Sequence, residues 1–155
     1  MNIKELIGEA TEYNKKQSLE VKKPKSWCKS VSAFANTCGG ILIFGITDHD
    51  QMVGLQNPEM DAEKISEIIK NRLDPIPEFT LRFERTEDQK TMIILDIQKG
   101  EETPYYYSGD GVLEAYVRVG NESVKATSTE LKRFDFFWSG KRTRISYECR
   151  SINRR

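Results

Sequence analysis

The 155-residue chain lacks several features that would assign its class directly. Its three cysteines, Cys28, Cys38 and Cys149, are odd in number and irregularly spaced, which argues against a disulfide framework and a structural zinc site. His49 is the only histidine, so the chain offers no histidine cluster for a metal. No apolar run approaches the ~20 residues of a membrane helix, and the N-terminus has no apolar signal core. We therefore expect a cytoplasmic protein without membrane contact.

A net charge is also absent, because 24 Lys and Arg residues balance 24 Asp and Glu residues. The balance hides an asymmetry: residues 140–155 carry six basic side chains against Glu148 alone, so they stand at +5 and the rest at −5. Whole-chain charge therefore does not predict a general nucleic-acid binder, although it allows a local basic patch. We expect one compact domain over residues 1–139, followed by a basic tail or linker at residues 140–155.

The most informative stretch covers residues 31–48. Val31 and Phe34 share one face at helical spacing. Gly39 follows the last good helix former, where a left-handed cap is expected. The unbroken apolar run at residues 41–46 is typical of a strand covered on both faces. The stretch therefore predicts a helix that is capped at Gly39 and leads directly into a central strand.

Periodicity predicts the other elements. The expected helices cover residues 2–13, 24–37, 58–73 and 128–138, and the expected strands cover residues 19–22, 40–47, 79–85, 91–98, 104–107 and 115–119. Met52 begins a return strand for a hairpin, Asn57 is the expected N-cap of the third helix, and Thr127 with Glu130 forms a capping box for the last. This order predicts an α/β (α+β) fold with an N-terminal helix and a C-terminal strand-strand-helix addition.

Several short motifs resemble those of the Schlafen-type AlbA-like domain. They are Glu-Val-Lys at residues 20–22, Ala-Phe-Ala-Asn-Thr-Cys-Gly-Gly at 33–40, Gly-Ile-Thr-Asp at 45–48, Val-Gly-Leu at 53–55 and Ala-Tyr-Val-Arg-Val-Gly-Asn-Glu-Ser at 115–123. The resemblance covers about residue 9 to about residue 138 and implies an Alba-like β-α-β-α-β-β core. It also brings two functional labels, DNA binding and divergent AAA-type ATP binding.

A strip of lysines near the N-terminus is the first candidate site. It comprises Lys15, Lys16, Lys22, Lys23, Lys25 and Lys29, with Glu20 as the only acid among them. Such a cluster can neutralise phosphates. Tyr13 and Trp27 flank it and could stack on unpaired bases, although burial in the core explains Trp27 better. The alternative is a solvated strand edge and helix start.

Arg118 and Asn121 extend this candidate site. Arg118 lies in the segment that resembles the family's Tyr-Val-Arg motif and could contact a phosphate. Its alternative role is a structural ion pair with a carboxylate such as Glu20. Asn121 and Ser123 follow in the next turn, where side chains and backbone can bond phosphate oxygens.

Three acids form the second candidate site. Glu20, Asp48 and Asp50 could hold Mg²⁺ or Mn²⁺ and orient a water for phosphodiester cleavage. The resemblance assigns Glu20 and Asp48 to two catalytic positions of the ribonuclease members. The third position falls at residues 15–17, where this chain has Lys-Lys-Gln, and this departure argues against nuclease activity. Turn formation is the alternative role of Asp48 and Asp50.

ATP binding through Gly39 and Gly40 is disfavoured by topology. A phosphate loop needs a helix N-terminus after its glycines, whereas here a helix C-terminus precedes them and a strand follows. We therefore expect no firm cofactor beyond the Mg²⁺ or Mn²⁺ of the nuclease alternative.

The expected partners are nucleic acid, DNA or RNA, and a second copy of the chain. Core filling explains some of the dense aromatics at residues 105–107 and 134–138, and one set could cover a homodimer interface, because aromatics concentrate there. Family members often continue into a further C-terminal region. We expect the N-terminal nucleic-acid-binding module of a transcriptional regulator. A Schlafen-type metal-dependent endoribonuclease and a dimerisation or interaction module are the alternatives.

Overall fold

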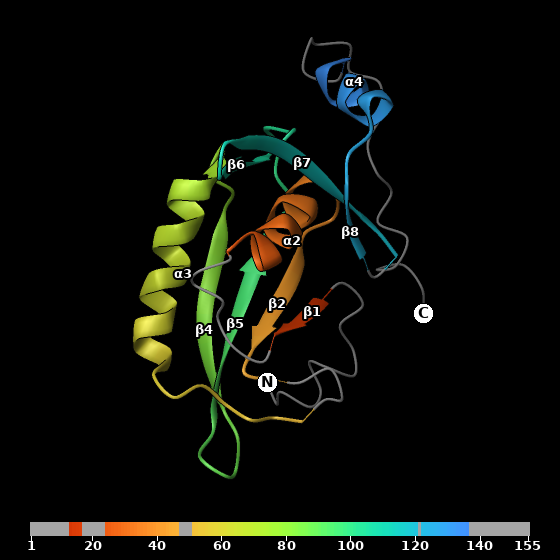
Figure 1. The fold of residues 1–155 in the computed structure, drawn as a ribbon. Helices are drawn as coiled ribbons and strands as arrows, with labels where there is room; N and C mark the ends of the chain where they lie inside the picture. Colours follow the sequence, from red (N-terminus) through yellow and green to blue (C-terminus); the bar gives the residue numbers. More distant parts are fainter. Residues whose placement is uncertain (1–12, 17–23, 47–50, 121, 137–155) are drawn as a thin grey trace.

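Two four-stranded sheets pack around one central helix (Figure 1). The computed structural model describes residues 13–16, 24–46, 51–120 and 122–136. Helix α2 (Lys25–Asn36) contacts β2 and β5 of the first sheet and β6, β7 and β8 of the second. Because the helix is covered from both sides, every residue from Ser30 to Asn36 is buried.

The first sheet has the order β1-β2-β5-β4. Its strands are β1 (Tyr13–Lys16), β2 (Gly40–Phe44), β5 (Thr91–Ile97) and β4 (Phe79–Arg85). β1 runs parallel to β2, and the other pairs are antiparallel. β2 and β5 are apolar on both faces: Leu42 and Leu95 pack in the main core, and Ile43 and Ile94 pack in a smaller cluster. Helix α3 (Pro58–Arg72) adds Ile65 and Ile69 to the main core.

The second sheet has the order β3-β6-β7-β8 and is antiparallel throughout. Its strands are β3 (Leu73–Asp74), β6 (Tyr106–Gly109), β7 (Val112–Val119) and β8 (Glu122–Lys125). Helix α2 packs on β7, while Ala115 and Val117 form a separate cluster with Leu131 of α4 (Ser128–Phe136). The sheet therefore has one face toward the central helix and one toward α4.

The expected helix ends are confirmed. Gly39 adopts φ +76° and donates its N–H to the Phe34 carbonyl at 2.8 Å, which closes α2 with a left-handed cap. A Cβ on Gly39 would lie 2.8 Å from the Ile97 carbonyl oxygen, so the cap also sits tightly against β5. Asn57 accepts the Met60 N–H and caps α3.

The capping box that precedes α4 is confirmed as well. The Thr127 N–H donates to the Glu130 carboxylate at 2.8 Å, and the Glu130 N–H donates to the Thr127 hydroxyl at 3.2 Å. Two backbone donors that α4 leaves without helical partners are thereby satisfied.

Several element boundaries differ from the sequence predictions. Tyr13 begins strand β1 instead of ending a helix, and residues 2–12 and the expected strand at 19–22 lie outside the described residues. The predicted hairpin after the central strand is reduced to one bridge between Ile46 and Met52.

The second sheet also contains two strands, β3 and β8, that the sequence did not predict. The turn between β6 and β7 is centred on Asp110 and Gly111, which both have positive φ, at +54° and +80°. These values are those of a tight two-residue hairpin turn. The α+β class is confirmed.

Candidate functional site

One stripe of helix α2 faces strand β7. Lys25, Lys29, Ser32 and Asn36 follow one another at intervals of four, three and four residues, so they lie on one side of the helix. Lys25 reaches Glu114 on β7, whereas Ser32 and Asn36 reach the backbone of Tyr116. The stripe therefore changes from charged to neutral along the helix, from its exposed start to its buried end.

The buried end holds two polar side chains against the backbone of the second sheet. The Asn36 amide donates to the carbonyls of Tyr105 and Tyr116 at 3.0 and 2.9 Å, and its oxygen accepts the Tyr105 N–H at 2.6 Å. Ser32 donates to the Tyr105 carbonyl at 2.7 Å and accepts the Tyr116 N–H at 3.1 Å. These bonds satisfy backbone groups that would otherwise be buried without partners, so both side chains fix the sheet on the helix.

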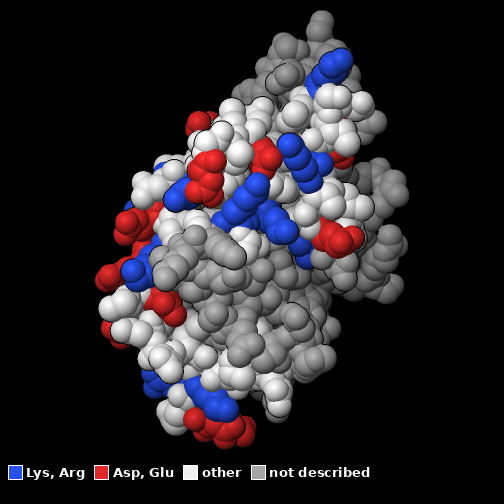
Figure 2. Space-filling model, in the orientation of Figure 1, with Lys and Arg blue, Asp and Glu red and all other residues white. Residues whose placement is uncertain are grey.

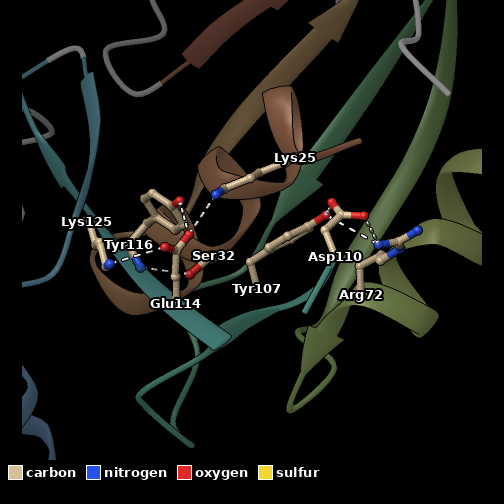
Figure 3. A network of polar contacts seen from close by, with 8 residues as sticks. All are labelled: Lys25, Ser32, Arg72, Tyr107, Asp110, Glu114, Tyr116 and Lys125. Atoms are coloured by element: carbon tan, nitrogen blue, oxygen red, sulfur yellow. Dashed lines mark hydrogen bonds and ion pairs between the residues drawn. The ribbon is translucent and has the colours of Figure 1, made fainter. Parts of the chain in front are cut away.

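The exposed end of the stripe is a charged cluster around Glu114 (Figure 3). The Glu114 carboxylate lies 2.8 Å from the Lys25 ammonium and 3.1 Å from that of Lys125, and it accepts the Tyr116 O–H at 2.8 Å. The bonds from Lys25, Tyr116 and Lys125 lower the pKa of Glu114 from 4.5 to about 2. The hydrogen bond to Glu114 raises the pKa of Lys25. Glu114 is therefore ionised at neutral pH and partly neutralises two lysines.

Arg118 lies on the same face of β7 as Glu114 and Tyr116, because alternate residues of a strand share a face. Its guanidinium carbon lies 4.9 Å from the centre of the Phe34 ring, and Nη1 donates to the Ser123 hydroxyl at 2.8 Å. Ser123 in turn donates to Ser30 on α2 at 3.0 Å. The guanidinium is thus held by a ring beneath it and a hydroxyl beside it, at the point where α2, β7 and β8 meet.

A second polar cluster braces the turn between β6 and β7 (Figure 3). Asp110 accepts the Tyr107 O–H at 2.9 Å and pairs with Arg72 of α3 at 3.3 Å. Burial, followed by the bond to Asp110, raises the pKa of Tyr107 to about 12. The bonds from Tyr107 and Arg72 lower the pKa of Asp110. Since both charges have a local partner, we assign this cluster a structural role.

The junction of α2, β7 and β8 is locally basic. The charged side chains of these three elements are four bases, Lys25, Lys29, Arg118 and Lys125, and two acids, Glu114 and Glu122. Figure 2 shows Lys and Arg side chains gathered near the middle of this face, with acids at their border. We name the four bases the junction patch. Its local excess of positive charge contrasts with a chain whose net charge is zero.

Comparison with models of protein families shows which family the chain belongs to. A family model described as Schlafen, AlbA_2 matches residues 8–127. The chain belongs to the Schlafen AlbA_2 family. The match includes all five motifs that carried the resemblance, and the junction patch lies within it.

A solved structure has the same fold. It is the solution NMR structure of the N-terminal domain of a protein from Nitrosomonas europaea, described as related to the ATP-dependent DNA helicase RecG. The identity is 22% and the TM-score 0.55, with 81% of this chain and 90% of that chain covered. No match was found among curated proteins.

The structure of this AlbA_2 domain brings together three of the predicted binding residues. Lys25, Lys29 and Arg118 meet at the junction patch. Lys15 and Lys16 lie in β1, next to β2, and only their backbone is described. The other predicted binding residues, Lys22, Lys23 and Asn121, lie outside the described residues.

Lys125 and Glu114 were missed in the sequence. β8 has a single strand-forming apolar residue, Val124, so its periodicity gave no signal for Lys125. The alternation of Glu114, Tyr116 and Arg118 was the only available sign that Glu114 shares a face with the predicted arginine.

Aromatic residues offered as contacts are mostly part of the core. Trp27 is fully buried, edge-on to Phe44 with ring centres 5.6 Å apart, so it cannot stack on a base. Tyr105 and Tyr107 are buried in the same core, so these two rings fill the core and are not available to cover a dimer interface. The side chains of residues 134–138 are not among those described.

The proposed metal ligands Glu20, Asp48 and Asp50 lie outside the described residues, as does His49. Within the described ranges, no group of three or more His, Cys, Asp or Glu residues is placed to hold a metal ion. Gly39 directs its N–H at a carbonyl of its own helix, which agrees with its role as a cap. No helix in the described part of the chain is long and apolar enough to cross a membrane.

Proposed function

We propose that this AlbA_2 domain binds nucleic acid by contacting the phosphate backbone with the junction patch. The observation that carries the proposal is the placement of Arg118. Its guanidinium is packed on Phe34 and bonded to Ser123, so little side-chain freedom is left to lose when it contacts a phosphate. Arginine in a fixed orientation is well suited to phosphate oxygens.

The lysines of the patch come from two elements beside this arginine. Lys25 and Lys29 come from α2, one turn apart, and Lys125 comes from β8. The side chain of Lys125 is 65% exposed and that of Lys25 is 41% exposed, so both ammonium groups can follow a nearby phosphate while their pairing with Glu114 is exchanged. Contacts of this kind carry no base preference, and they serve DNA and RNA alike.

Membership of the Schlafen AlbA_2 family supports the same proposal in outline, because the resemblance to AlbA-like domains implies DNA binding. The solved neighbour is named as a relative of a DNA helicase. We extend the proposal to an N-terminal module of a transcriptional regulator. This extension rests on the family resemblance alone.

The test is a fluorescence-anisotropy titration of labelled single- and double-stranded DNA and RNA at two salt concentrations, in EDTA. We expect salt-sensitive binding of the wild-type chain. Lys29→Gln and Lys125→Gln should each weaken it and reduce the slope of log K against log salt by about one. Lys70→Gln is the matched control, because Lys70 is an exposed lysine on α3, away from the junction patch.

The outcomes separate the alternatives. Binding that is unchanged in both variants, or equally weakened in the Lys70 control, contradicts the proposal. Adding Mn²⁺ to the bound complexes tests the nuclease alternative. If the wild type cleaves the oligonucleotides and Asp48→Asn leaves them intact, catalysis would be assigned to the acids outside the described residues. No binding to any oligonucleotide would leave an interaction module.

A further inference from the structure

Strand β4 forms one edge of the first sheet, and its outer side has no strand partner among the described residues. Figure 1 shows it at the side of the sheet opposite β1. The strand is seven residues long, pairs with β5 without a bulge, and contains neither proline nor lysine. Edge strands are commonly protected by bulges, proline or charged side chains, and β4 has only the last of these, so it is suited to pairing with a strand whose charges complement its own.

The side chains of β4 indicate what kind of strand that partner is. Phe83 is 48% exposed, and it lies on the same face as Leu81, which packs on the main core. Arg82 and Glu84 flank it and lie on the opposite face, beside Ile94 and Met92 of β5. Neither Arg82 nor Glu84 forms an ion pair with another described residue. The edge thus carries an exposed ring, the opposite charges of Arg82 and Glu84 without a described counter-ion, and a further positive charge, Arg85, as its last residue.

We propose that β4 pairs antiparallel with β4 of a second copy of this chain, and that the pairing is centred on Phe83. The first sheet of one copy and the first sheet of the other then form one continuous sheet. In an antiparallel pair, directly opposite residues lie on the same face of the sheet. A two-fold axis perpendicular to the sheet must therefore pass midway between the two copies of one and the same residue. Centring on Phe83 places the two rings opposite each other and places Arg82 of each copy opposite Glu84 of the other. One symmetry operation therefore creates two pairs of opposite charge.

The neighbouring registers are worse. Centring on Arg82 sets arginine against arginine, and centring on Glu84 sets glutamate against glutamate, and like charges directly opposite each other are destabilising. Centring on Leu81 brings Glu84 opposite Glu78, again a like pair. Of these registers, only the one centred on Phe83 pairs Arg82 with Glu84 and sets no like charges of β4 opposite each other.

Phe83 indicates that helix α3 does not fully cover this part of the edge, because its side chain is 48% exposed. Its main sheet contacts are with β5, β3 and β6. Phe83 lies two residues from the end of β4, toward the turn that extends past the start of α3 (Figure 1). The proposed interface is separate from the junction patch, so it does not depend on nucleic-acid binding.

The test uses charge reversal in the full chain, measured by sedimentation equilibrium at up to about 1 mM protein, without nucleic acid. We expect a concentration-dependent dimer of the wild-type chain. Arg82→Glu places glutamates opposite each other twice, and Glu84→Arg does the same with arginines, so each should raise the dimer dissociation constant at least about tenfold. Circular dichroism and thermal melting establish that each variant is folded.

Rescue distinguishes pairing from simple damage. The double variant Arg82→Glu/Glu84→Arg restores both opposite pairs and should dimerise like the wild type. A 1:1 mixture of the two single variants should form a heterodimer, because the glutamate introduced in one chain then faces the arginine introduced in the other. Lys99→Glu and Glu101→Arg make similar charge reversals at exposed positions off the strand and should leave the dimer unchanged.

The proposal is overturned by three results. One is a wild-type chain that stays monomeric over the whole concentration range. Another is a dimer that survives both single reversals, since it would use another surface. The third is a mixture of the single variants that stays monomeric, since the register would then be wrong.

Discussion

The two ends of the contact between α2 and β7 are built differently. At the buried end, Ser32 and Asn36 bond to backbone atoms of the second sheet, and no charge is involved. At the exposed end, Lys25 and Lys125 meet Glu114, and each of these bonds joins two charged side chains. Neutral bonds buried between elements fix one arrangement, whereas exposed charges can exchange partners. The same helix face therefore supplies stability at one end and the charges of the proposed binding surface at the other.

The largest expected effect is at the buried end. Asn36→Ala removes three bonds to backbone atoms and leaves the Tyr105 N–H and the Tyr116 carbonyl buried without that partner. Since an unsatisfied buried backbone group costs about 1 to 3 kcal/mol, we expect the free energy of unfolding to fall by about 3 to 5 kcal/mol. Urea denaturation at pH 7 measures it. A loss below about 1 kcal/mol would mean that the neutral end does not hold the second sheet.

Ser32→Ala should have a smaller effect of the same kind. The Tyr116 N–H loses its side-chain acceptor, but the Tyr105 carbonyl keeps its bond from Asn36. We expect the free energy of unfolding to fall by about 1 to 2 kcal/mol. Ser128→Ala, at the exposed start of α4, is a serine control for the same urea titration and should change it far less.

At the exposed end, Glu114→Gln should lower stability at pH 7 by less than about 1 kcal/mol, because solvent screens the two ion pairs. Its pH dependence is more specific. The pKa of Glu114 is lowered from 4.5 to about 2, so its contribution is fully present above about pH 4.5 and is lost as the pH falls toward 2. The urea midpoints of wild type and variant should therefore differ at pH 6 and converge near pH 2. A difference that is constant with pH would assign the effect to another cause.

Glu114→Gln also tests whether the charged end of the contact differs from the buried end in oligonucleotide binding. Without the Glu114 charge, Lys25 and Lys125 are released from their pairs, and the face that carries the junction patch loses one negative charge. If the patch contacts phosphates, Glu114→Gln should bind oligonucleotides several-fold more tightly in the anisotropy titration, whereas Asn36→Ala at a temperature where it is folded should not. Weaker binding by Glu114→Gln would show that the carboxylate positions the lysines for the ligand.

The smallest effect is expected at the turn between β6 and β7. Asp110→Asn keeps a side chain that tolerates positive φ and can still accept from Tyr107. Because Asp110 is an exposed residue, we expect the thermal midpoint to shift by no more than about 2 °C and oligonucleotide binding to be unchanged. A change in binding would extend the proposed binding surface to this turn.

Features that depend on neighbouring residues could be predicted from the sequence. The cap at Gly39, the N-cap at Asn57 and the capping box at Thr127 and Glu130 each follow from a few adjacent positions, and all are confirmed. The hairpin strands at residues 79–85 and 91–97 follow from alternation and from a polar turn.

The role of Asn36 shows what such patterns omit. The sequence shows Asn36 as part of a family motif but does not predict its role, because its partners Tyr105 and Tyr116 lie 69 and 80 residues away. Glu114 and Lys125 were missed for the same reason, since their meeting with Lys25 depends on how the second sheet docks on α2. Arg118 was found as a candidate, but its support by Phe34 and Ser123 required the fold.

The long span of the Asn36 bonds also bears on the order of folding. The strands β6, β7 and β8 follow one another through short turns and can form early as a local unit, as can the hairpin of β4 and β5. Docking of the β6–β8 unit on α2 must instead close a loop of 69 residues or more, which costs chain entropy before any bond is gained. Asn36 should therefore form its bonds after the rate-limiting barrier. Its loss would then speed unfolding while leaving the folding rate almost unchanged.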